Sequence, residues 1–251
     1  MQQRVSILNG AFNPLTMSQT IEAVFQALDS GHRGWLCTVN VTTLMMMRSD
    51  ANLQSFVDRS LLVVADGQPL VWCAPLFGRH LPERVAGIDL MDSLCSRAEV
   101  EGKRVYLLGS SEQLLKSAIR TLRNSYPKLQ IDGSDGFFSA GLAESQARKI
   151  RASGADLLFV GMGCPRQEIF LSEQWGKLGV GVAIGVGGSF DVLGGAFFRA
   201  PHWMRRAGLE WLFRLVQEPK RLLPRYFKNN LRFCLLITNA VVGRLAHWPK
   251  N

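Results

Sequence analysis

A chain of 251 residues, with 47% hydrophobic and 20% charged residues, is typical of a globular domain with or without an appendage, and argues against a disordered protein. Its five cysteines are odd in number and form no CxxC pair, which argues against a disulfide scaffold or a zinc site and favours a reduced, cytoplasmic protein. The formal net charge is +9, which favours an anionic partner.

The chain opens with MQQRVSILNG, which lacks the long apolar stretch of a signal peptide. From there, short apolar runs that usually stop at Gly, Asn or Asp alternate with amphipathic stretches. The runs predict strands at Val5–Leu8, Trp35–Val39, Leu61–Ala65, Val105–Leu108, Gln130–Gly133, Leu157–Val160 and Val182–Val186. The stretches predict helices at Thr16–Ser30, Thr42–Arg48, Leu53–Asp58, Gly87–Glu99, Ser111–Ser125, Ala143–Ser153 and Pro165–Lys177. This alternation is typical of an α/β fold with a mostly parallel sheet and flanking helices.

Ligands of open α/β sheets bind outside the carboxyl ends of the strands. Four loops follow predicted strands at this edge, and we expect the active site among them: Thr38–Thr43, Asp66–Pro69, Gly109–Ser111 and Gly161–Gln167.

Two of these loops carry side chains suited to chemistry. Asp66 follows a buried strand, where a carboxylate can accept a proton from a substrate hydroxyl, although Asp-Gly is also an ordinary turn. Thr38 and Asn40 are expected to contact a ligand, whereas Thr42 or Thr43 is expected to cap the next helix.

Glycine-rich turns follow the last two predicted strands. Pro165 suits the first turn of a helix, so that Arg166 and Gln167 lie near a helix N-terminus, which attracts anions. Gly187 and Gly188 let backbone amides approach a nucleotide, or simply allow a tight turn. They form neither a GxGxxG nor a Walker sequence.

The sequence shows no DxD motif and no histidine spacing that suits a metal, so we expect neither a metal nor another cofactor. Arginine would then neutralise any diphosphate. Arg214, Arg221 and Arg225 would share one face of a continuous helix, but Pro219 and Pro224 predict a break or a bend.

The positive charge is confined to the last part of the chain. Residues 196–251 hold eleven basic and two acidic residues, whereas residues 1–195 are neutral, which predicts a body and a basic appendage. Large apolar side chains interleave with these cations: Trp203, Trp211, Phe213, Leu222, Leu223, Tyr226 and Phe227. They favour an anionic membrane surface over nucleic acid, with a helix folded onto the body as the other alternative. The apolar segment Phe233–Leu245 is too short to span a bilayer and predicts a buried or interfacial helix.

The sequence resembles the WecG/TagA/CpsF family, glycosyltransferase family 26. The matching segments run in order from about residue 5 to 228: TVNVTTL, VVADGQPLVW, RVAGIDL, VYLLGSS, FVGMGCPRQE, GVGGSFDVLGG and RAPHWMRRAGLEWLFRLVQEPKRL. The resemblance implies a Rossmann-like catalytic body at residues 1–195 and a membrane-targeting appendage at residues 196–251. It also implies metal-independent, inverting transfer of a hexosyl unit from a UDP-sugar to a saccharide on a polyprenyl diphosphate.

The same resemblance assigns roles to residues. Asp66 matches the family's general base, Thr38 and Asn40 its polar loop, and Gln167 its site glutamine. Arg214, Arg221 and Arg225 match appendage arginines that reach the nucleotide diphosphate. The expected location is the cytoplasm, with peripheral attachment to the inner face of the bacterial plasma membrane.

Some alternatives stay open. The loop after Asn40 reads Val-Thr where many members have Pro-Glu, which removes a carboxylate near the site. The donor is N-acetylmannosamine, its uronic acid or glucose, and the pathway and the oligomeric state are not defined. A non-catalytic basic module that binds membrane or nucleic acid is the main competing interpretation. A Rossmann oxidoreductase is disfavoured because the early chain lacks a GxGxxG turn.

Overall fold

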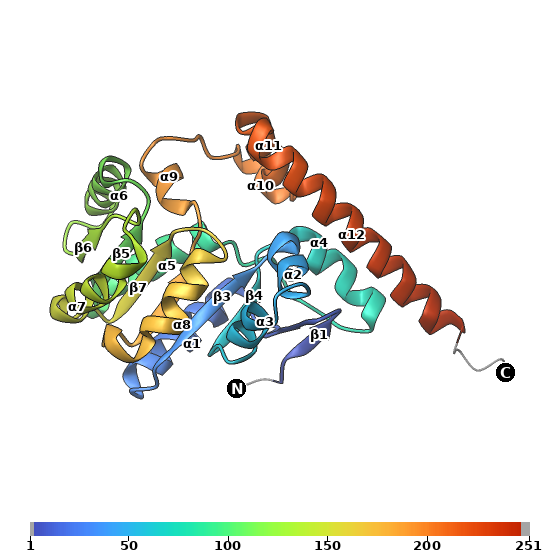
Figure 1. Ribbon diagram of the computed structural model, residues 1–251, viewed down its shortest axis with the longest axis horizontal. Helices are drawn as coiled ribbons and strands as arrows, with labels where there is room; N and C mark the ends of the chain where they lie inside the picture. The colour runs from blue at the N-terminus through green and yellow to red at the C-terminus, as the bar shows by residue number, and fades with distance from the viewer. Residues whose placement is uncertain (1–2, 247–251) are drawn as a thin grey trace.

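A six-stranded parallel sheet forms the centre of the computed structural model, which describes residues 3–246 (Figure 1). The order across the sheet is β4 (Leu62–Ala65), β3 (Gly34–Val39), β8 (Val182–Gly185), β7 (Leu157–Gly161), β5 (Arg104–Gly109) and β6 (Gln130–Ser134). Every neighbouring pair is parallel, which confirms the predicted α/β class. Residues 1–2 and 247–251, at the ends of the predicted body and appendage, lie outside the described residues.

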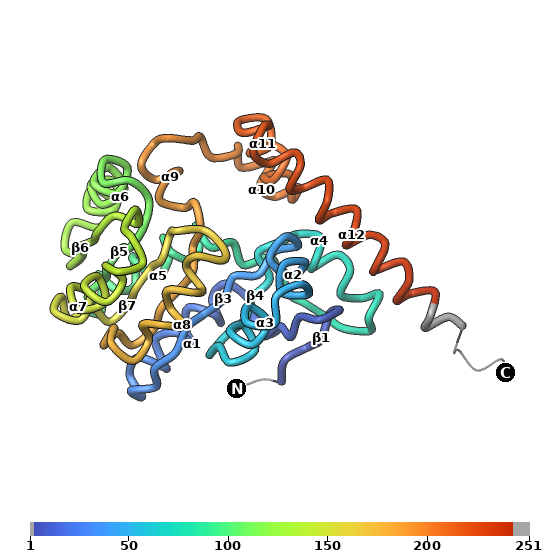
Figure 2. Tube along the Cα trace, viewed as in Figure 1, coloured from blue at the N-terminus to red at the C-terminus, as the bar shows by residue number. Residues whose placement is uncertain are grey.

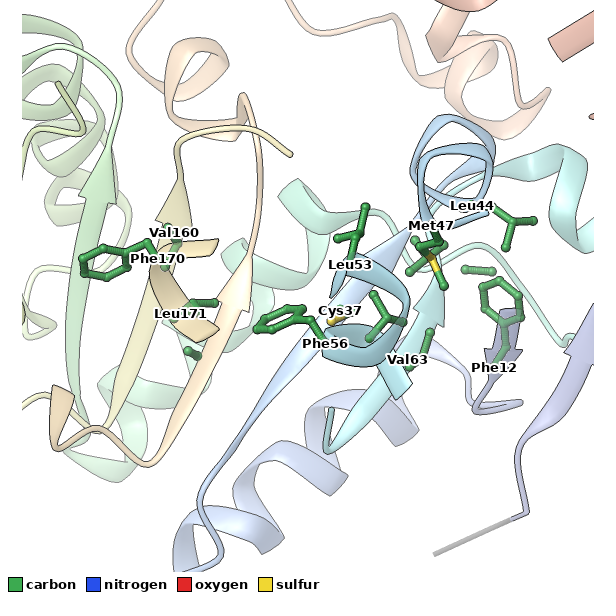
Figure 3. Close-up of a cluster of buried hydrophobic side chains, with 14 of the residues drawn as sticks. Phe12, Cys37, Leu44, Met47, Leu53, Phe56, Val63, Val160, Phe170 and Leu171 are labelled. Carbon is green, nitrogen blue, oxygen red and sulfur yellow. The ribbon is translucent and has the colours of Figure 1, made fainter. Parts of the chain in front are cut away.

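The inner strands carry apolar side chains on both faces, and helices cover both faces of the sheet. One face is covered by α1 (Met17–Asp29), α5 (Gly87–Glu101), α6 (Glu112–Ser125) and α9 (Ser189–Leu193). The other is covered by α2 (Val41–Met47), α3 (Ala51–Asp58), α4 (Gln68–Cys73), α7 (Ala143–Ser153) and α8 (Arg166–Leu178). Figure 3 shows part of the second core, where Phe56 of α3 and Leu171 of α8 pack beside Cys37 of β3.

The predicted first strand lies outside the main sheet. Residues Val5–Ile7 (β1) form an antiparallel hairpin with β2 (Gly10–Phe12), whose Phe12 is fully buried under Leu44 and Val63 (Figure 3). Two short 3₁₀ turns, Ala74–Phe77 and Ala140–Leu142, were also not predicted. The remaining predicted strands and helices agree with the structure to within a few residues at each end.

The last part of the chain forms three helices along the carboxyl edge of the sheet. After α9 the chain crosses to α10 (His202–Arg206) and α11 (Glu210–Gln217), and then α12 (Pro219–Ala246) runs outward past α2 (Figure 2). The helical path breaks before Pro219, as predicted, but α12 continues through Pro224. Pro219 is the first residue of α12, where a missing N–H costs no intrahelical bond, whereas Pro224 lies beyond the first turn.

The appendage packs on the body through one side of α12. Leu222 and Phe233 are buried, and Leu236 and Ile237 pack against the core, which confirms a partly buried helix in the first part of the segment Phe233–Leu245. The side chains from residue 243 onward lie outside those described. Among residues 3–246, no helix is long and apolar enough to cross a membrane.

Candidate active site

A pocket of about 820 Å³ lies at the carboxyl edge of the sheet, where the appendage covers it. The loops after β3, β4, β5, β7 and β8 form its floor and walls, as the positions of the strand ends predict. Helices α11 and α12 supply the opposite wall. All the predicted site residues line this pocket: Thr38, Asn40, Asp66, Arg166, Gln167, Gly187, Gly188, Arg214, Arg221 and Arg225.

Asp66 follows β4 directly and lies at one end of the pocket. Burial raises the pKa of Asp66 to about 7, and the carboxylates of Glu210 and Asp89 act in the same direction, against the opposing effects of the Arg84 guanidinium and the Gly87 N–H. A carboxyl group whose pKa is near 7 is divided between its acid and its base at neutral pH. That property suits a group that accepts a proton during a reaction.

Thr38 lies beside Asp66 in the same recess. A Cβ added to Gly87, the first residue of α5, would lie 3.4 Å from Thr38 Oγ1 and 3.8 Å from Asp66 Oδ2, so all three residues meet there. The Thr38 hydroxyl donates to the Gly185 carbonyl at 3.0 Å, which fixes the side chain on the next strand. The hydroxyl oxygen can still accept a hydrogen bond.

Asn40, and not Thr42 or Thr43, caps α2. Its Oδ1 accepts hydrogen bonds from the Thr43 N–H at 3.0 Å and the Thr43 hydroxyl at 3.3 Å, so the predicted cap was wrong by two or three positions. The side-chain carbonyl of Asn40 reaches the N–H of Thr43, the third residue of the helix. Thr42 and Thr43 themselves already lie inside the first turn. The Asn40 amide nitrogen is the end of the side chain that suits a ligand acceptor.

Gln167 connects two loops under the pocket. It is buried, its Nε2 donates to Glu168 Oε1 at 2.8 Å, and its Oε1 accepts the Gly187 N–H at 3.2 Å. Gly187 has φ of +53°, a left-handed conformation that favours glycine. Gln167 thus holds the glycine-rich turn in place. Helix α8 begins at Arg166, one residue later than predicted, so Pro165 is its N-cap residue and not part of its first turn.

The arginines of the appendage reach the same pocket from two helices. Arg214 of α11 extends over Gly188, so closely that a Cβ at that position would collide with its guanidinium. Arg221 of α12 binds Glu218, and Arg225 lies farther along, with Nη2 at 4.0 Å from Met46 Sδ. The three do not share one helix face, but the turn at residue 218 brings them to one wall. Arg166, from the body, donates to the Gly136 carbonyl at 3.1 Å.

Charged residues that the sequence did not reveal join the body to the appendage. Arg84 binds Glu210 of α11 at 2.8 Å, and Arg199 binds Asp89 of α5 and lies 3.7 Å from Glu210. Arg84 is also among the groups that act on the pKa of Asp66.

A second unforeseen pair lies after β5. Ser110 has φ of +58°, and its hydroxyl donates to Asp191 Oδ1 at 2.6 Å. Both residues line the pocket near the glycine-rich turn. A strained, non-glycine residue at a strand end is typical of functional sites, and the loop Gly109–Ser111 was expected at the site because it follows a predicted strand.

The fold and the site together indicate an enzyme with an arginine-lined pocket at the carboxyl edge of a Rossmann-like sheet. Comparison with known proteins makes this specific. Residues 5–246 match the family model described as "Glycosyl transferase WecG/TagA/CpsF family", and the chain belongs to that family of glycosyltransferases.

Among similar proteins are N-acetylglucosaminyldiphosphoundecaprenol N-acetyl-β-D-mannosaminyltransferases of three bacteria. The protein of Bacillus subtilis (strain 168) is 33% identical over 197 residues, 76% of each chain. That of Bacillus spizizenii is 32% identical over 195 residues, 77% of this chain and 75% of its own. That of Staphylococcus aureus (strain MW2) is 29% identical over 221 residues, 87% of each chain. These similarities support the interpretation as an enzyme over that as a non-catalytic basic module.

Proposed function

We propose that this glycosyltransferase moves an N-acetylmannosaminyl unit from UDP to an N-acetylglucosaminyl diphosphate carried by a polyprenyl lipid. The relatives' names supply the transferred sugar and the acceptor. One observation carries the proposal: a single pocket is lined both by a carboxyl group of the body with a pKa of about 7 and by guanidinium groups of the appendage. This division of charge matches an alcohol that must lose a proton and a diphosphate that must leave.

The proposed reaction is one displacement with inversion at the anomeric carbon. Asp66 accepts the proton of the acceptor hydroxyl as its oxygen bonds to the anomeric carbon, and the bond from that carbon to the UDP oxygen breaks. Arg214 and Arg221 stabilise the negative charge that develops on the diphosphate. Thr38 and Asn40 orient the sugars, while Gln167 acts by holding Gly187. The guanidinium groups fill the role that a divalent ion has in other glycosyltransferases.

The direct test is transfer to a synthetic polyprenyl-diphosphate N-acetylglucosamine, with UDP-N-acetylmannosamine, its uronic acid and UDP-glucose as separate donors. We expect N-acetylmannosamine to be transferred at least about tenfold faster than the others, since one hydrogen-bonding group on a sugar commonly discriminates by that much or more. Nuclear magnetic resonance should show a β-linkage in the product. Retained configuration, or no transfer from any of the three donors, would contradict the proposal.

We further propose that the appendage holds the enzyme at the inner face of the plasma membrane. Leu223, Phe227, Leu231 and Leu235 recur every four residues along α12 and are 51–71% exposed, on the side that does not pack on α2. Lys220 and Lys228 lie on the same exposed helix. An apolar stripe flanked by cations suits the headgroup region of an anionic bilayer.

The double substitution Phe227→Glu and Leu231→Glu is expected to lower binding to phosphatidylglycerol vesicles at least about tenfold. Two exposed side chains that bury their apolar surface in lipid contribute roughly 1.5–3 kcal/mol each, and the added carboxylates repel the surface. Sedimentation with vesicles measures the effect. The double substitution Val100→Glu and Leu142→Glu, which places the same two charges on exposed apolar sites of the body, is the control and should bind normally. Equal binding by the α12 double variant would refute this attachment.

A further inference from the structure

The carboxylate of Glu218 lies between the two arginines assigned to the diphosphate. Arg221 donates to it twice, Nε to Oε1 at 2.7 Å and Nη2 to Oε2 at 2.6 Å, and Arg214 Nε lies 3.7 Å from the same Oε2. Glu218 is the residue that joins α11 to α12, and its side chain is only 13% exposed. It lines the pocket beside the arginines it binds.

An ordinary surface ion pair does not describe this arrangement. Surface pairs join two exposed side chains and contribute little to stability. Here a single, largely buried carboxylate lies near guanidinium groups from two different helices, and one of them extends over the glycine-rich turn at Gly188. The Nε of Arg214 is buried and makes no hydrogen bond within the described residues. That donor is therefore not held by Glu218 within hydrogen-bond distance.

The two-pronged contact of Arg221 with Glu218 is the geometry by which arginine also binds phosphate. Two oxygens of the Glu218 carboxylate therefore occupy the kind of position that two diphosphate oxygens would take. Both anions cannot hold the same donors at once. A diphosphate that binds Arg221 through these same two donors therefore displaces the Glu218 carboxylate.

We propose that Glu218 is a positioning residue that stands in for the diphosphate: it holds Arg214 and Arg221 in place when the pocket is empty and is displaced when a nucleoside diphosphate binds. This inference rests on the proposed function, because it takes UDP as the leaving group. Exchange of one anion for another keeps the arginines ordered throughout the cycle. It also weakens the hold on UDP after transfer, since the carboxylate competes to return, and thereby speeds product release.

The test is Glu218→Gln in the full-length chain, with Glu144→Gln as the matched control. Glu144 also pairs with cations, Lys177 and Arg148, but lies on exposed α7, so the control makes the same change in net charge away from the pocket. Calorimetric titration with UDP, uridine and inorganic pyrophosphate gives the affinities. We expect E218Q to bind UDP and pyrophosphate about tenfold more tightly, the scale of one charge-assisted hydrogen bond, and uridine as the wild type does.

Kinetics give a second readout that a merely structural role would not change. The inhibition constant of product UDP should fall in E218Q by the same factor as its dissociation constant, and kcat should fall because UDP leaves more slowly. E144Q should match the wild type in both. Glu218→Asp, which keeps the charge, should restore the weaker UDP binding at least in part.

The outcomes separate the inference from the proposed function. Wild-type protein that binds neither UDP nor pyrophosphate would contradict both. Normal wild-type binding, with unchanged or weaker binding in a folded E218Q, would contradict the displacement alone. A crystal structure of the wild-type UDP complex decides the matter even if E218Q does not fold: the inference requires that Arg221 has exchanged Glu218 for a phosphate oxygen, and an intact Glu218–Arg221 pair would overturn it.

Discussion

Asp66→Asn is expected to lower the rate of sugar transfer about 10²- to 10⁴-fold, the usual contribution of a general base. Asparagine has nearly the same shape but cannot accept the proton of the acceptor hydroxyl. UDP binding should change little, because the proposed diphosphate contacts lie at the other wall of the pocket, on α11 and α12. A radiolabelled-sugar transfer assay, together with UDP titration of the same sample, measures both quantities.

The wild-type enzyme adds a pH profile to this test. Since Asp66 must be deprotonated and its pKa is about 7, kcat/KM should fall about tenfold for each pH unit below 7 and level off above it. Asp66→Asn should lose this dependence. Asp29→Asn, an exposed carboxylate paired with Lys103, is the control and should keep both the rate and the profile. A folded D66N enzyme with a near-normal rate would exclude Asp66 as the base.

The double substitution Arg214→Gln and Arg221→Gln should lower kcat by about 10²-fold or more, since a single donor to a developing oxyanion commonly contributes 10²–10³-fold. KM for the UDP-sugar should rise as well, because the ground-state diphosphate also loses its partners. Steady-state kinetics at saturating acceptor separate the two effects.

Two controls show whether the effect belongs to these arginines. The double variant Lys116→Gln and Arg148→Gln removes two exposed cations from the body and should be fully active. A chelator such as EDTA should leave the wild-type rate unchanged, because arginines and not a divalent ion carry the charge. Transfer that survives loss of both arginines but stops with EDTA would reverse the assignment.

Much of the fold follows from local patterns. Runs such as Leu157–Val160 could only be buried strands, and the spacing of Leu115, Ala118 and Leu122 fixed the buried face of α6. The hairpin of β1 and β2 was missed because Gly10–Phe12 is too short to show alternation, and because its burial depends on Phe12 packing under α2. The Asn40 cap was missed because Asn40, Thr42 and Thr43, all within four residues, suit a helix start equally.

The site residues also fall into those that the sequence predicted and those that it did not. Asp66 follows β4, Thr38 lies near the carboxyl end of β3, and Gln167 lies in the first turn of the helix after β7, so the sequence was sufficient to place them at one edge of the sheet. The pairing of Arg84 with Glu210 joins residues 126 positions apart, and no local pattern predicts it. Glu218 resembled an ordinary helix-end carboxylate until the turn between α11 and α12 placed it among arginines.

The ion pair between Arg84 and Glu210 has a consequence for the chemical strength of the base. Glu210 belongs to α11, and its charge helps to raise the pKa of Asp66, while Arg84 opposes it. Lifting α11 away would remove Glu210, leave only Asp89 to oppose Arg84 and admit water, and each of these changes makes Asp66 more acidic. A more acidic carboxyl is a poorer proton acceptor. An enzyme whose α11 has left the body would therefore have a weaker base and would lose less of its activated sugar to reaction with water.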